Sequence, residues 1–140
     1  MLIFGEELID TPVLSLQTGT ELARTEQAII DPSNLHLVGY KLSGRLLSNP
    51  NNSYIRTNEI REYAPLGLIV NSNDDILTED DIITQKQIYE LGFNPVGLKV
   101  IDEHKSRLGK VVGYTVNIPS FTILQLRVAK SGIYQIVNTD

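Results

Sequence analysis

The chain has 140 residues, 41% hydrophobic residues and a formal net charge of −5. This composition supports a packed core, and the negative charge disfavours strong non-specific binding to nucleic acid. The absence of cysteine excludes disulfides, thiolate metal sites and cysteine nucleophiles. No segment has the pattern of a secretory signal or the length of a membrane span. The sequence therefore predicts a cytoplasmic protein without membrane insertion.

The charge is unevenly distributed along the chain. Residues 1–85 contain five Lys/Arg and thirteen Asp/Glu, a net charge of −8, whereas residues 86–140 contain seven and four, a net charge of +3. Two interpretations are open. Either the two halves have different solvated faces, or the asymmetry steers a partner or favours head-to-tail contact between copies.

The first half of the chain alternates short apolar runs with turn residues, which is typical of β structure. Asp31-Pro32-Ser33-Asn34 is a turn cluster, 48–53 is a polar loop, and Thr57–Ile60 indicates a further short turn. The runs that predict strands lie at 12–16, 28–30, 35–47, 54–55 and 67–70.

One helix is predicted at about residues 79–91. Thr78 is a suitable N-cap, and the acidic residues after it fall in the first turn, where the helix dipole favours them. Gly92 is placed to end the helix in a left-handed conformation, and Pro95 prevents its continuation. We expect this helix to connect two β-rich segments.

After the helix the β pattern resumes. Residues 96–101, 111–116, 121–128 and 133–137 predict strands, and Ser131-Gly132 is a hairpin-type turn. Tyr114 and Tyr134 lie in apolar runs, so core packing is the expected role for both, as it is for Tyr54 and Tyr63.

The two β-rich segments match each other at an offset of 86 residues. Leu14 then corresponds to Val100, Leu22 to Leu108, and Ile30 to Val116, while 35–42 corresponds to 121–128. Size and polarity agree over about 30 positions although few residues are identical. This agreement predicts one supersecondary unit used twice, and the alternative is chance similarity between two β meanders.

The repeated pattern is a short apolar strand, a polar turn, a Leu-(Gly/Ala)-basic step and a long alternating strand. It resembles the PRC-barrel family, and its clearest copy contains Val100-Ile101-Asp102, Leu108-Gly109-Lys110-Val111 and Phe121–Val128. The resemblance implies a mostly β fold of two small PRC-barrel-like modules joined by one short helix. The expected boundaries are 1–77 for the first module, 78–93 for the connecting helix and 94–140 for the second.

The second module lacks a closing strand after 133–137. Either the native chain continues past Asp140, or another segment completes the module. That segment is either the Leu2–Phe4 run or a neighbouring molecule, because an unpaired edge invites association. Self-association through an open barrel edge is therefore one expectation.

The sequence offers no strong catalytic, cofactor or metal site. His104 lies in a polar turn and His36 in an alternating strand, with no nucleophile beside either. The acids between Asn73 and Asp81 lack the spacing of a calcium loop and suit a helix start. Gly109-Lys110 lacks the other residues of a phosphate loop, so close backbone approach explains Gly109 better.

Charged residues form two candidate interaction surfaces, one basic and one acidic. The basic surface comprises Lys105, Arg107, Lys110 and Arg127, together with Lys99 and Lys130, and the acidic surface comprises Asp74, Asp75, Asp80 and Asp81. The resemblance implies a non-catalytic, protein-binding adaptor with an unidentified protein partner. The alternative is an RNA-processing or ribosome-maturation accessory factor that contacts RNA through its basic second half; an enzyme is not expected.

Overall fold

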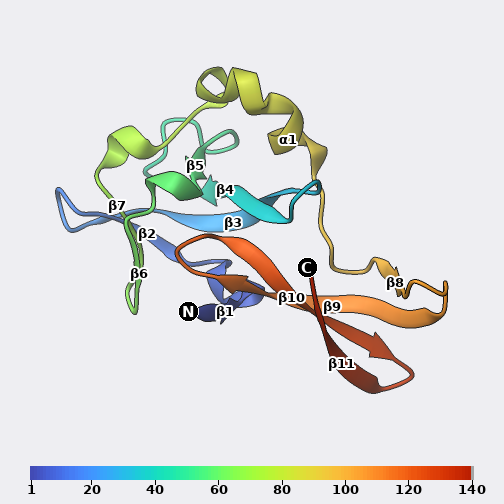
Figure 1. The fold of residues 1–140 in the computed structure, drawn as a ribbon. Helices are drawn as coiled ribbons and strands as arrows, with labels where there is room; N and C mark the ends of the chain where they lie inside the picture. The colour runs from blue at the N-terminus through green and yellow to red at the C-terminus, as the bar shows by residue number, and fades with distance from the viewer. Residues whose placement is uncertain (140) are drawn as a thin grey trace. The chain divides into compact units, whose positions relative to one another are not determined.

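The computed structural model describes residues 1–139, which divide into two compact units. The central unit comprises Glu7–Phe93, and the C-terminal unit comprises Met1–Glu6 together with Asn94 onward. Figure 1 shows the course of the chain through its strands and helical segments. The first six residues thus belong to the same compact unit as the later part of the chain.

The central unit contains six strands in the order β6-β7-β2-β3-β4-β5. Their bounds are β2 Pro12–Ser15, β3 Glu21–Asp31, β4 His36–Ser43, β5 Tyr54–Arg56, β6 Glu62–Ala64 and β7 Gly67–Val70. All neighbours are antiparallel except β2 and β7, which are parallel. Alternating apolar residues fill the interior, and Val13, Leu37, Leu42 and Leu68 have no exposed surface.

The predicted helix is present as a seven-residue 3₁₀ segment, Glu79–Gln85, followed by α1, Lys86–Leu91. Thr78 and Asp81 form a capping box, and Gly92 ends the helix at φ +67°. The helix packs against its own unit, because Ile82 and Tyr89 join Ile29 and Tyr54 in one buried cluster.

The C-terminal unit is built around a long antiparallel pair, β9 (Arg107–Asn117) and β10 (Thr122–Lys130). β8 (Lys99–Ile101) and β1 (Leu2–Phe4) both pair with β9, and β11 (Ile133–Asn138) pairs with β10. The Leu2–Phe4 run, one of the segments considered for completing this unit, thus lies antiparallel along β9 rather than beside β11.

The expectation of two separate barrel modules joined by a helix is wrong. The eleven strands belong to one mixed sheet. Within each unit the strand order runs from edge to edge without closing, so neither unit is a barrel by itself. The mostly β content and the helix were predicted correctly. Closure was predicted wrongly, because within each unit the strands at the two ends of the order do not pair with each other.

The strands correspond closely at the 86-residue offset. Shifting β3 by 86 gives the exact bounds of β9, and shifting β4 gives 122–129 against the observed 122–130. The bulges also correspond, since the β3–β4 register shifts across 25–27 and the β9–β10 register across 111–113. The turn residues Leu35 and Phe121 have φ values of +56° and +55°.

Candidate functional site

One face of the C-terminal unit carries a cluster of side chains around Arg127, which we call the Arg127 face. The register places Gly113 and Ile136 opposite Arg127 on the two neighbouring strands. A β-bulge at Val112 adds one residue to β9 at this point, so Val112 and Gly113 both face Arg127. Without the bulge, consecutive β9 residues would point to opposite faces of the sheet.

Arg127 is fixed across the strand β9. Its Nη2 donates to both carboxylate oxygens of Glu6, at 2.9 and 2.8 Å, and its Cζ lies 4.6 Å from the centre of the Phe4 ring. This path exists only because Gly113 has no side chain: a Cβ there would lie 1.9 Å from the same nitrogen. The ion pair also accounts for the position of Glu6. Burial raises the pKa of Tyr114, and the negative charge of Glu6 raises it further.

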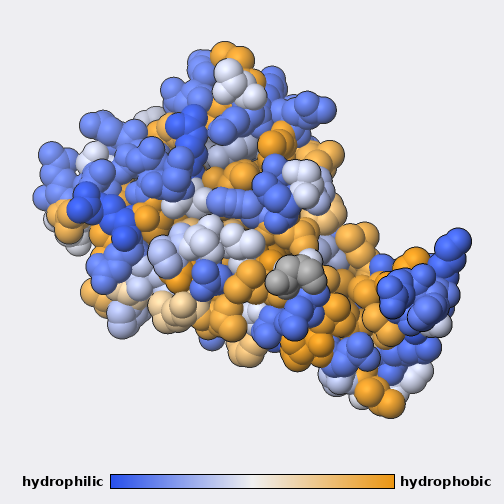
Figure 2. Space-filling model, in the orientation of Figure 1, coloured by the Kyte–Doolittle hydropathy of each residue, from blue (hydrophilic) through white to orange (hydrophobic). Residues whose placement is uncertain are grey.

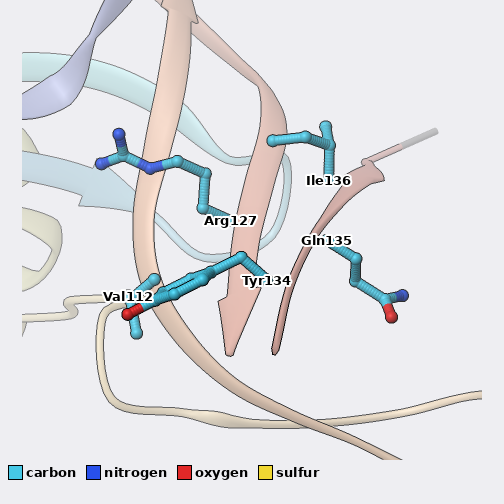
Figure 3. A pocket seen from close by; sticks show the side chains of 5 residues that line it. All are labelled: Val112, Arg127, Tyr134, Gln135 and Ile136. Carbon is cyan, nitrogen blue, oxygen red and sulfur yellow. The ribbon is translucent and has the colours of Figure 1, made fainter. Parts of the chain in front are cut away.

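An apolar cleft of about 330 Å³ lies beside Arg127 on this face. Figure 3 shows the side chains of Val112, Arg127, Tyr134 and Ile136 around it, with the Gln135 side chain pointing away. The exposed fractions of Tyr134 and Ile136 are 71% and 56%. The expectation that Tyr134 packs in a core is therefore wrong, whereas Tyr54 and Tyr114 are buried as predicted.

The strand β11 forms an edge of the C-terminal unit, and within residues 1–139 it pairs only with β10. The Thr139 N–H donates to the Leu124 carbonyl on the β10 side at 3.0 Å. Because strand N–H groups alternate in direction, those of Tyr134, Ile136 and Asn138 point away from β10. The strand contains no charged residue and no proline.

Cations gather at one end of the C-terminal unit, near the β8–β9 hairpin. Lys99 pairs directly with Lys110 across the two strands, and Lys130 Nζ donates to the Arg107 carbonyl at 3.0 Å. In Figure 2 hydrophilic residues cover this end of the unit on the face shown. Within the described residues, none of these four cations forms an ion pair with a carboxylate.

The predicted basic surface is therefore divided. Lys105, Arg107 and Lys110 are exposed near the hairpin, whereas Arg127 is held by Glu6 with only 24% of its side chain exposed. Lys105 adopts φ +65° in the turn, where the Asp102 carboxylate accepts backbone N–H groups from His104 and Ser106. His104 is thus an exposed turn residue, as expected.

The predicted acidic surface lies in the central unit at the starts of two 3₁₀ segments, Asn73–Asp75 and Glu79–Gln85. Asp75 accepts from the Ser72 backbone N–H at 3.3 Å, and Asp81 accepts from the Thr78 N–H at 2.9 Å. Asp74 and Asp80 are exposed beside them. No group of three His, Asp or Glu side chains is placed to hold a metal ion anywhere in residues 1–139.

His36 and Gly109, the other residues considered in the sequence analysis, lie where packing and backbone contacts explain them. His36 is half-buried and lines a cavity of about 140 Å³ with Arg56, which donates to the Asp81 carbonyl at 3.1 Å. Gly109 has φ +133°, and a Cβ there would lie 2.3 Å from the Ala129 carbonyl oxygen, which confirms the expected close approach.

Sequence reasoning missed the residues that line the cleft, namely Val112, Tyr134 and Ile136. The available signal was the composition of 133–138, a short, apolar and uncharged run next to a hairpin turn.

No helix in the described residues has the length and apolar character needed to cross a membrane. The scan against protein-family models matches no family, and the search of curated proteins finds no match.

Proposed function

We propose that the chain is a non-catalytic protein-binding module that accepts an extended segment of a partner protein as an added strand along β11. The observation that carries this proposal is that β11 has an unpaired backbone edge and exposed apolar side chains. Its outward N–H groups have no strand partner in residues 1–139, and Ile133, Tyr134 and Ile136 are all more than half exposed. Natural edge strands are usually protected by charges, proline or bulges, and β11 has none of these.

Strand addition uses two features that are both found here. Main-chain hydrogen bonds along a free edge supply affinity, and pockets for alternate side chains supply specificity. The cleft beside Tyr134 and Ile136 is such a pocket, because side chains of an added strand would alternate between the two faces of the sheet. The adaptor role implied by the PRC-barrel resemblance is compatible with this mode of binding.

We also propose that the segments 12–43 and 98–130 are two copies of one ancestral β module. The coinciding strand bounds, bulges and turn conformations support this proposal. On this view the module is a small three-stranded unit, rather than a complete barrel, and each copy acquired different neighbouring segments.

The proposal is tested with a photoreactive residue placed at Gln135 and, as a control, at Glu62 on β6. Cross-linking in extracts of the cells that make the protein should capture a protein at Gln135 only. The captured partner is then purified. It should bind the Ile136→Pro variant at least about tenfold more weakly than the wild type, because proline removes an outward N–H. Ile136→Ala keeps that N–H and should bind more tightly than the proline variant. A partner that binds Ile136→Pro as well as the wild type contradicts the proposal.

A second candidate function, contact with RNA, is favoured by one observation: Lys99 lies opposite Lys110 without a neutralising carboxylate. Five exposed cations occur in this unit, at Lys99, Lys105, Arg107, Lys110 and Lys130. Binding of single-stranded RNA that weakens with salt and disappears on charge reversal of Arg107 and Lys110 would support it. No binding at low salt would eliminate it.

A further inference from the structure

The central unit contains a strand that occupies the same ladder position as β11. In the central unit Lys41 of β4 pairs with Tyr54 of β5, and in the C-terminal unit Arg127 of β10 pairs with Ile136 of β11. Lys41 and Arg127 are equivalent at the 86-residue offset. Tyr54 and Ile136 are therefore equivalent neighbours of equivalent strands, although their exposed fractions are 7% and 56%.

The chain itself covers the outer edge of β5. The Tyr54 N–H donates to the Leu77 carbonyl at 2.9 Å, and the Leu77 N–H donates to the Tyr54 carbonyl at 2.8 Å. Leu77 thus forms an isolated antiparallel β-bridge with Tyr54, in the place where a further strand would pair with β5. The Tyr54 ring is then covered by Tyr89, with ring centres 5.3 Å apart in an edge-to-face arrangement, and both rings belong to a buried cluster with Ile82.

The covering segment has a distinct chemistry. Leu77 and its neighbour Ile76 lie between two acidic groups, Asp74-Asp75 before them and Glu79-Asp80-Asp81 after them. The segment is thus a short extended apolar stretch flanked on both sides by carboxylates. The central unit, to which this segment belongs, carries a net charge of −7 over residues 7–93.

The equivalent edge in the C-terminal unit is complementary to a segment of this kind. Ile136 presents outward backbone groups at the position of Tyr54, beside an apolar cleft. Lys110 is linked to Tyr134 through the cross-strand pairs of Ala129, so it lies on the same face as the cleft. Lys99 of β8 lies directly opposite Lys110, so it adds positive charge to this face at longer range from β11. In the central unit the bulge position equivalent to Val112 is Glu26, which pairs with Lys41 at 3.9 Å.

We infer that the β11 edge binds an extended partner segment in which one bulky apolar residue is flanked by acidic residues. The apolar side chain enters the cleft formed by Val112, Arg127, Tyr134 and Ile136, and a carboxylate on the same face lies toward Lys110. This inference rests on the proposed strand addition and specifies its partner. The segment Ile76–Asp81 shows, within the same molecule, the chemistry that covers an equivalent edge.

The test is selection of a random twelve-residue peptide display library against the full chain. The expected consensus contains one Leu, Ile, Phe or Trp next to Asp or Glu residues. Because the protein has no tryptophan, a tryptophan in the selected peptide reports entry into the cleft by a blue shift of its emission. Affinity should fall as salt screens the lysines.

Three variants locate the bound peptide. Val112→Glu gives β9 the residue that β3 carries at the equivalent bulge, and it should lower affinity at least about tenfold. Ile136→Pro should abolish binding by removing an outward N–H. Leu66→Glu, at a position 77% exposed in the central unit, is the charge-matched control and should bind like the wild type.

The outcomes separate the inference from the proposed function. Loss of binding in Ile136→Pro, with normal binding in Val112→Glu or a consensus without acidic residues, overturns the inference and leaves strand addition in place. Failure to enrich any peptide, or equal binding to Ile136→Pro, overturns both. A wild-type dimer in sedimentation that Ile136→Pro converts to monomer identifies a second copy as the occupant, which also overturns the inference.

Discussion

The strands β5 and β11 show how the same ladder position leads to opposite surroundings. Each is the outer neighbour of an equivalent long strand, and each presents backbone groups outward at an equivalent residue, Tyr54 or Ile136. In the central unit, residues 77–91 return to cover this position, whereas in the C-terminal unit no described segment pairs with it. The burial of an edge strand is therefore determined by a later segment, and not by the strand's own sequence.

The largest expected effect that tests this comparison is on stability. Tyr54→Ala should lower the free energy of unfolding by about 3–5 kcal/mol, because it empties a buried aromatic site and removes the contact with Tyr89. Ile136→Ala should change it by no more than about 0.5 kcal/mol, because its side chain is mostly exposed. Urea unfolding measures both, and a similar loss in the two variants would show that β11 is covered in solution.

A smaller effect is expected at the bulges. Gly113→Ala should lower stability by about 1–3 kcal/mol, because the added Cβ displaces the Arg127 guanidinium from Glu6. Gln27 occupies the equivalent place in β3 and is exposed, so Gln27→Ala should be nearly neutral. If Gly113→Ala unfolds at the wild-type urea concentration, Arg127 does not lie across β9 as described.

The packing of Tyr89 over Tyr54 of β5 also predicts that stability depends on pH in the alkaline range. Burial raises the pKa of Tyr89 above its ordinary 10.0, so its contribution to stability is complete below pH 10. Above pH 10 the unfolded chain ionises first, and stability falls by up to about 1.4 kcal/mol per pH unit for this group. Urea unfolding between pH 8 and 11 should show a shallower decline for Tyr89→Phe. Identical declines in the two proteins would remove this explanation.

The most subtle prediction concerns single amides, without any change in stability. In the free protein, the N–H groups of Tyr134, Ile136 and Asn138 should exchange with solvent faster than those of Gln135 and Val137, which point toward β10. The Tyr54 N–H, bound to Leu77, should be protected. Residue-resolved hydrogen exchange by NMR measures this pattern, and uniform protection along β11 would show that an unrecognised segment covers the edge.

The sequence predicted local features better than their arrangement. The Thr78 cap, Gly92 and the offset of 86 residues all act over short ranges or through composition, and they located the helix and the long strands. Sheet closure and the exposure of Tyr134 were predicted wrongly, because an apolar alternating run has the same pattern whether or not a distant segment covers it. Arg127 was predicted as part of the basic surface, but its ion pair was not, since its partner Glu6 is 121 residues away and its path depends on the missing side chain at Gly113.

The pairing of β1 with β9 has a consequence for how the protein is made. Leu2 pairs with Asn117 and Phe4 with Thr115, so β1 finds its partner only after more than a hundred further residues have left the ribosome. The intervening residues 7–93 form the central unit, whose own pairings can be completed meanwhile. We therefore expect nascent chains halted after residue 93 but before β9 has left the exit tunnel to protect the Glu7–Phe93 region from protease while β1 is still cleaved.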